Sequence, residues 1–99
     1  LEGEFRHIGT AVGDPVWPLP LWDEYLEDIK GTYADIGNVG NTKWGGAITA
    51  AIFLKQFVTY PWVHIDIAPR MTSISGEYLA KGSIGAGVQL LVRFLSTKA

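Results

Sequence analysis

The stretch that decides the fold is WVHIDIAPRM, residues 62–71, in which apolar and polar residues alternate. Successive side chains of a strand point to opposite faces, so Val63, Ile65 and Ile67 would share one face. The valine and isoleucine content predicts a β-strand with that face in a core. A single strand needs neighbours for its backbone N–H and C=O groups, and the sequence predicts no second strand. We therefore expect an α/β unit whose sheet is completed by residues outside the chain.

Two polar residues inside this stretch, His64 and Asp66, raise the question of a metal or catalytic site. They stand two residues apart, so both side chains would point to the same face of the strand. A metal site needs at least one more ligand, and the sequence offers none at a recognisable spacing. We expect a structural role, with hydrogen bonds from both side chains to nearby loops, while a functional role stays open.

Helices are predicted before and after this strand. The segment LWDEYLEDIK, residues 21–30, places Trp22, Tyr25 and Ile29 on one helical face. Its acidic residues cover the other face, which we interpret as solvated because no histidine stands at metal-ligand spacing. The predicted helices are residues 1–13, 21–30, 47–58 and 88–95, and the predicted connecting segments are residues 14–20, 31–46 and 69–87.

The two later helices differ in their pattern. Residues 47–58 are apolar almost all round, with Lys55 as the one charged residue, so we expect burial on most sides. Residues 88–95 have one apolar face, made of Val88, Leu91, Val92 and Leu95.

Composition limits the kinds of function. The chain has 99 residues, a formal net charge of −2 and no cysteine. It lacks a block of lysine and arginine, so we expect no nucleic-acid partner. The longest apolar stretch, residues 47–54, is far shorter than a membrane span, so we expect no membrane partner. Neither a G-x-S-x-G elbow nor a phosphate-binding loop occurs, and we identify no complete active site.

Three motifs point to a known family: PVWPLPLWDEY at residues 15–25, NVGNTKWGGAITAAIFLKQFV at residues 38–58 and WVHIDIA at residues 62–68. In this order and spacing they resemble the C-terminal part of the leucyl (cytosol) aminopeptidases, from about Gly13 to Leu95. The resemblance implies that residues 1–99 are a C-terminal segment of the catalytic domain. It also implies the fold, which is the C-terminal portion of a mixed β-sheet flanked by helices, zinc-exopeptidase-like and incomplete as a domain.

The resemblance further implies a cytoplasmic enzyme that releases N-terminal amino acids from peptides. Two divalent metal ions, zinc or manganese, would activate a bridging water. The family's metal ligands and catalytic residues belong to motifs that these 99 residues lack, so we assign no catalytic residue and no metal ligand here. We expect the segment to be inactive alone, to need the remainder of the catalytic domain, and to belong to a homo-hexamer when intact.

Residues of the substrate pocket can be carried over by the resemblance. It implies that Ala68 and Met71 line the pocket for the N-terminal side chain and that Val39 lines the next subsite. Small, apolar and flexible groups suit leucine-like side chains. Core packing is the alternative role for all three residues.

A second function from a different class stays open. The chain is 47% hydrophobic and has four tryptophans, which suggests surfaces that are covered by something outside it. This apolar content and the single predicted strand also suit a non-catalytic peptide-binding or interaction module that completes a partner's sheet.

Overall fold

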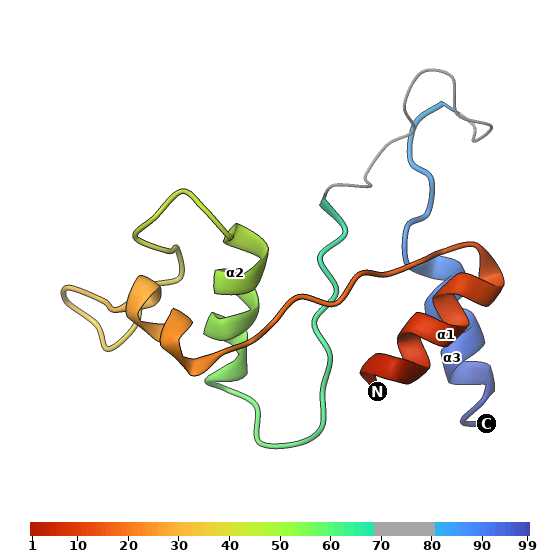
Figure 1. Cartoon of the computed structure of the whole chain (residues 1–99), viewed down its shortest axis with the longest axis horizontal. Coiled ribbons are helices and arrows are strands. Elements are labelled where there is room, and N and C mark those ends of the chain that lie inside the picture. Colours follow the sequence, from red (N-terminus) through yellow and green to blue (C-terminus); the bar gives the residue numbers. More distant parts are fainter. Residues whose placement is uncertain (69–80) are drawn as a thin grey trace. The chain divides into compact units, whose positions relative to one another are not determined.

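A computed structural model of the chain describes residues 1–68 and 81–99, and these residues form three α-helices and one 3₁₀-helix (Figure 1). The elements are α1 (Glu2–Val12), η1 (Asp23–Ile29), α2 (Gly46–Lys55) and α3 (Val88–Ser96). They fall into a terminal unit, residues 1–17 and 65–99, and a central unit, residues 18–64. None of the helices in the described ranges is long and apolar enough to cross a membrane.

The prediction of an α/β fold, with a mixed β-sheet flanked by helices, is wrong. The described residues form helices and no strand, and they pair only as isolated bridges such as Lys30 with Ile36. Residues 61–67 form neither helix nor strand. Alternation makes a segment suitable for a strand, but a strand exists only where a neighbour takes its hydrogen bonds, and no described segment does so.

The predicted core face of this stretch is also largely wrong. Val63 is 41% exposed and Ile67 is 51% exposed, whereas only Ile65 is half-buried and packs on a core cluster. Without a paired sheet, the alternation of side chains does not impose one buried face.

Helix α1 confirms the prediction made for residues 1–13. It ends at Gly13, whose φ of 75° is the left-handed conformation typical of a helix C-cap. The backbone N–H of Asp14 donates to the carbonyl oxygen of Gly9 at 2.8 Å. Gly9 is buried, and a Cβ added there would lie 2.6 Å from the carbonyl oxygen of Asp14. This close approach requires glycine at position 9.

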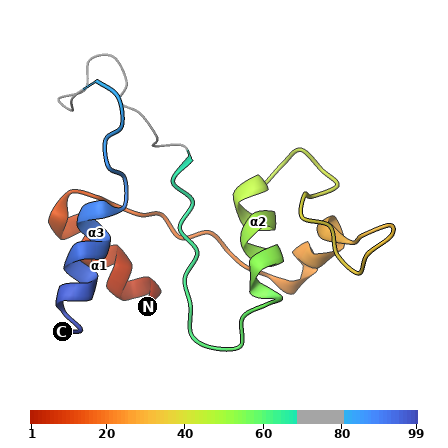
Figure 2. The same cartoon turned by 180° about the vertical axis from the view of Figure 1, so that it is seen from behind.

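The terminal unit is held by packing between α1 and α3, which lie side by side in both views (Figure 2). Phe5, Ile8 and Leu90 form its buried cluster, and Leu90 has no exposed surface. The rings of Phe5 and Phe94 are 4.6 Å apart between centroids. At the start of α3, the Leu90 N–H donates to the Asp14 carboxylate at 3.4 Å, where a negative charge favours the helix dipole.

Helix α3 confirms the prediction of a helix over residues 88–95, but its most apolar face is exposed. Leu90 is buried and Phe94 is half-buried, and both belong to the cluster shared with α1. The side chains of the face predicted from spacing are all exposed: Val88, Leu91, Val92 and Leu95.

The central unit is built on η1 and α2, whose buried residues Ile29 and Ile52 have almost no exposed surface. The segment predicted as an α-helix over residues 21–30 is a shorter 3₁₀-helix, and Trp22 from its predicted apolar face is exposed. Helix α2 is also shorter than predicted. The prediction that α2 is buried on most sides is wrong for the described chain, because Ala50 and Leu54 are exposed.

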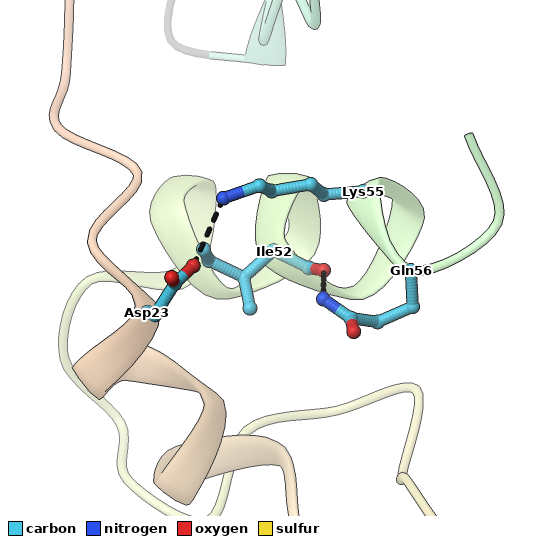
Figure 3. Close-up of polar contacts among 4 residues, drawn as sticks. All are labelled: Asp23, Ile52, Lys55 and Gln56. Carbon is cyan, nitrogen blue, oxygen red and sulfur yellow. Dashed lines mark hydrogen bonds and ion pairs between the residues drawn. The ribbon is translucent and has the colours of Figure 1, made fainter. Parts of the chain in front are cut away.

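A polar contact joins the two helices of the central unit. Lys55, the last residue of α2, donates from Nζ to Oδ1 of Asp23 at 3.0 Å (Figure 3). Beside it, Gln56 Nε2 donates to the carbonyl oxygen of Ile52 at 3.0 Å, which satisfies one acceptor at the end of the helix. Lys55 also places a positive charge at the negative end of the helix dipole.

Candidate functional site

The loop between η1 and α2 carries Val39, one of the predicted pocket residues. The first half of this loop turns back on itself through the bridge between Lys30 and Ile36. The Gly31 N–H donates to the Asp35 carbonyl oxygen at 3.3 Å, and the Gly37 N–H donates to the Ile29 carbonyl oxygen at 2.7 Å. The residues just before Val39 are therefore fixed to the end of η1.

The second half of the loop is fixed to the same end of η1. The Asn41 N–H donates to the Asp28 carbonyl oxygen at 2.6 Å, and the Thr42 N–H donates to Oδ1 of Asp28 at 2.9 Å. The Asn41 side chain adds a longer bond of 3.4 Å to the Lys30 carbonyl oxygen. Val39 lies between these two anchored segments with its side chain 75% exposed, so it is free to contact a ligand or another part of the protein.

Ala68 lies at the end of the WVHIDIA stretch, in the terminal unit, and is exposed. Its N–H donates to Oδ1 of Asp66 at 3.0 Å, a local bond typical of an aspartate that stabilises a turn. This local contact at an exposed residue differs from the hydrogen bond to a nearby loop that was expected for Asp66. Met71, the third predicted pocket residue, lies outside the described residues.

His64 belongs to the central unit and is half-buried. Its ring centroid lies 6.4 Å from that of Trp62, and the two rings are tilted by 54°. In residues 1–68 and 81–99, no group of three or more His, Cys, Asp or Glu residues is arranged to hold a metal ion. The described residues therefore do not fit a metal centre.

An open hollow of about 740 Å³ lies on the central unit, lined by Leu21, Trp22, Asp23, Glu24 and Lys55. The ion pair between Lys55 and Asp23 neutralises one of its two carboxylates. Its charged groups are the two carboxylates and the Lys55 ammonium, and the lining holds no Ser, Thr, Cys or His side chain that a neighbouring base could activate as a nucleophile. The hollow is a surface depression without an assembled catalytic group.

The residues that hold the Val39 loop were not predicted from the sequence. Asp28 was assigned with its neighbours to a solvated acidic face, yet its Oδ2 is buried. Its Oδ1 and its backbone carbonyl both accept bonds from the loop. Gly40 in the same loop lies so close that an added Cβ would collide with Oδ2 of Asp28. No local pattern signals this contact, because the partners are twelve or more residues apart.

The catalytic-domain model of the cytosol aminopeptidase family matches residues 1–92. The chain belongs to the cytosol aminopeptidase family. The resemblance drawn from the three sequence motifs is thereby confirmed.

Relatives within the cytosol aminopeptidase family share this segment. A probable cytosol aminopeptidase of Aromatoleum aromaticum is 46% identical over 100 residues, which cover 100% of this chain and 19% of the relative. The corresponding protein of Solibacter usitatus is 53% identical over 83 residues, which cover 82% of this chain and 17% of the relative. The chain thus spans about a fifth of the length of the relatives it matches.

A solved structure of a leucine aminopeptidase also matches this chain. A mutant of tomato leucine aminopeptidase superposes with a TM-score of 0.82 and 36% sequence identity. The match covers 95% of this chain and 18% of the tomato chain.

Proposed function

We propose that this chain is a segment of a metal-dependent aminopeptidase that releases N-terminal amino acids from peptides. The observation that carries the proposal is the match of the family's catalytic-domain model to residues 1–92. The relatives' names, probable cytosol aminopeptidase and leucine aminopeptidase, support peptide substrates, a leucine-like N-terminal residue and a cytoplasmic location.

In this proposal the segment supplies part of the substrate pocket. Val39 contributes to the subsite for the residue after the scissile bond, and its exposed side chain on an anchored loop suits that role. Ala68 and Met71 contribute to the pocket for the N-terminal side chain. The exposed position of Ala68 and its small size leave room for a substrate group there.

The chemistry in this proposal comes from outside the segment. Two divalent ions, zinc or manganese, would polarise the scissile carbonyl and activate water when bound to the intact enzyme. None of residues 1–68 and 81–99 is proposed as a ligand, because no group of three potential ligands gathers among them. The homo-hexamer and the need for the remainder of the catalytic domain stay predictions.

The test is a chimera in which this chain replaces the matching 100-residue segment of the Aromatoleum aromaticum relative. Hydrolysis of leucine p-nitroanilide with manganese is measured for the chimera, for the relative and for the isolated 99-residue chain. We expect the chimera to be active and the isolated chain to be inactive. A soluble, folded chimera without activity, or turnover by the isolated chain, would contradict the proposal.

The pocket assignment is tested separately with Ala68→Leu in the chimera. The added side chain should reduce kcat/KM for a leucine substrate by about tenfold or more relative to an alanine substrate, because it fills the pocket. Ala11→Leu, an exposed position on α1, is the matched control and should leave the ratio of the two substrates unchanged.

A further inference from the structure

We infer that Asp28 is a positioning residue, which holds Val39 in place and so sets the preference for the residue after the scissile bond. The inference rests on the proposed function, because it assigns a role within the same substrate pocket. In this role Asp28 acts through its contacts with the loop.

The contacts between Asp28 and the loop are directional. Its backbone carbonyl accepts the Asn41 N–H at 2.6 Å, and its Oδ1 accepts the Thr42 N–H at 2.9 Å. A hydrogen bond from a backbone N–H to a carboxylate is charge-assisted and stronger than a neutral one. These two bonds fix two successive residues of the loop to one residue of η1.

Gly40, next to Val39, brings the loop into close contact with both helices of the central unit. A Cβ at this position would collide with Oδ2 of Asp28 and lie 3.3 Å from Oγ1 of Thr49. Thr49 is buried on α2. The loop backbone therefore sits against a carboxylate on one side and a helix on the other, with no space for a side chain.

The second carboxylate oxygen of Asp28 shows that this side chain is turned away from solvent. Oδ2 is buried and has no hydrogen-bond partner among the described residues. A buried acceptor without a partner is unfavourable, and an aspartate on a solvated helix face would avoid this by turning toward water. The side chain instead keeps Oδ1 directed at the loop.

The contacts of Asp28 restrict the position of Val39, because hydrogen bonds hold the loop on both sides of this residue. The Gly37 N–H bonds to the Ile29 carbonyl oxygen two residues before Val39, and the Asp28 contacts begin two residues after it. Ile29 itself is almost completely buried, so the attachment point is rigid. Removing the Asp28 carboxylate takes away the bond to the Thr42 N–H on the second side and leaves the Asn41 N–H bonded to the Asp28 backbone carbonyl, which would let Val39 shift without unfolding the unit.

The first experiment measures the anchor in the chimera by amide hydrogen exchange. Asp28→Ala should raise the exchange rate of the Thr42 amide by about tenfold, while the amides of α2 keep their protection. Asp28→Asn retains an oxygen at the Oδ1 position and should preserve most of the protection. Asp23→Ala, in the same 3₁₀-helix, is the matched control and should leave Thr42 unchanged. An unchanged Thr42 amide in Asp28→Ala would overturn the inference.

The second experiment measures specificity in the chimera with the dipeptides Leu-Leu and Leu-Gly. Asp28→Ala should lower kcat/KM for Leu-Leu about five- to tenfold, mainly through KM, and change Leu-Gly less than about twofold, because glycine has no side chain to contact Val39. Val39→Ala should act in the same direction, and Asp28→Asn should restore most of the preference.

The outcomes separate the two proposals. Equal losses for both dipeptides in Asp28→Ala, or no loss for either, would overturn the positioning role while leaving the aminopeptidase assignment intact. The positioning role would also be overturned if Val39→Ala changed the ratio of kcat/KM for Leu-Leu and Leu-Gly and Asp28→Ala did not. If the unsubstituted, folded chimera hydrolyses neither dipeptide, the proposed function itself fails.

Discussion

The terminal and central units of this chain are stabilised in different ways. The terminal unit joins α1 and α3, from opposite ends of the chain, through the buried side chains of Phe5, Ile8 and Leu90. The central unit is one continuous segment, and beside the packing of η1 on α2 it depends on backbone hydrogen bonds that attach a loop to η1.

The difference shows which unit holds an exposed apolar residue on an anchored loop. Loops positioned by a rigid scaffold are common places for binding residues. In the central unit, Val39 has an exposed side chain on such a loop. In the terminal unit, apolar packing leaves an exposed apolar helix face but no comparable anchored loop among the described residues.

The largest effects should come from truncating the most buried side chain of each unit. Leu90→Ala should lower the free energy of unfolding of the terminal unit by about 3–5 kcal/mol, because it leaves a cavity between α1 and α3. Ile52→Ala should do the same for the central unit. Residue-resolved hydrogen exchange should show lost protection in α1 and α3 for the first variant and in α2 for the second. Equal loss in all helices for either variant would show that the two units unfold together.

A smaller effect is expected from two glycines of α1. Gly9→Ala should destabilise the terminal unit by about 1–3 kcal/mol, because its Cβ meets the Asp14 carbonyl oxygen at 2.6 Å. Gly3→Ala is the matched control in the same helix. It has open space around it and should stabilise by about 0.5–1 kcal/mol through helix propensity. Thermal unfolding followed by circular dichroism measures both, and the same sign for both variants would contradict the close packing at Gly9.

Asp14 offers a test of the link between the end of α1 and the start of α3. Asp14→Ala should cost about 1 kcal/mol, since it removes the acceptor for the Leu90 N–H and a negative charge near the helix N-terminus. Asp14→Asn keeps the acceptor and should cost less. Urea unfolding measures the difference in the free energy of unfolding, and an unchanged stability in Asp14→Ala would contradict the contact.

The smallest effects should come from the two long-range ion pairs, one in each unit. Lys98 pairs with Glu4 at 2.7 Å, and Lys55 pairs with Asp23 at 3.0 Å. All four side chains are partly solvated, so Lys98→Gln and Lys55→Gln should each cost about 0–1 kcal/mol, and less at high salt. Lys98 also lies 5.0 Å from the Phe94 ring centroid, so its replacement should have the greater effect. An equal or reversed order would show that the ring contact contributes nothing.

Much of the site could not be predicted because its contacts are not local. The motif around Val39 led to a pocket assignment, which stays a prediction. Asp28 was overlooked because its acidic neighbours suggested a solvated face, and only the folded loop shows where its carboxylate points. Gly40 looked like ordinary turn chemistry, whereas its closeness to Asp28 and Thr49 requires the absence of a side chain.

The sequence by itself determined the family, through three motifs in order, and the positions of α1, α2 and α3, through apolar spacing and the glycines that flank the helices. These signals are local, because helical hydrogen bonds join residues four apart. Only the tertiary structure decided which face is buried and whether a strand forms. Leu90, rather than the more regular Val88 and Leu91 face, meets α1, and residues 62–67 have no described neighbour to pair with. Burial and strand pairing both require partners distant in sequence, which periodicity does not specify.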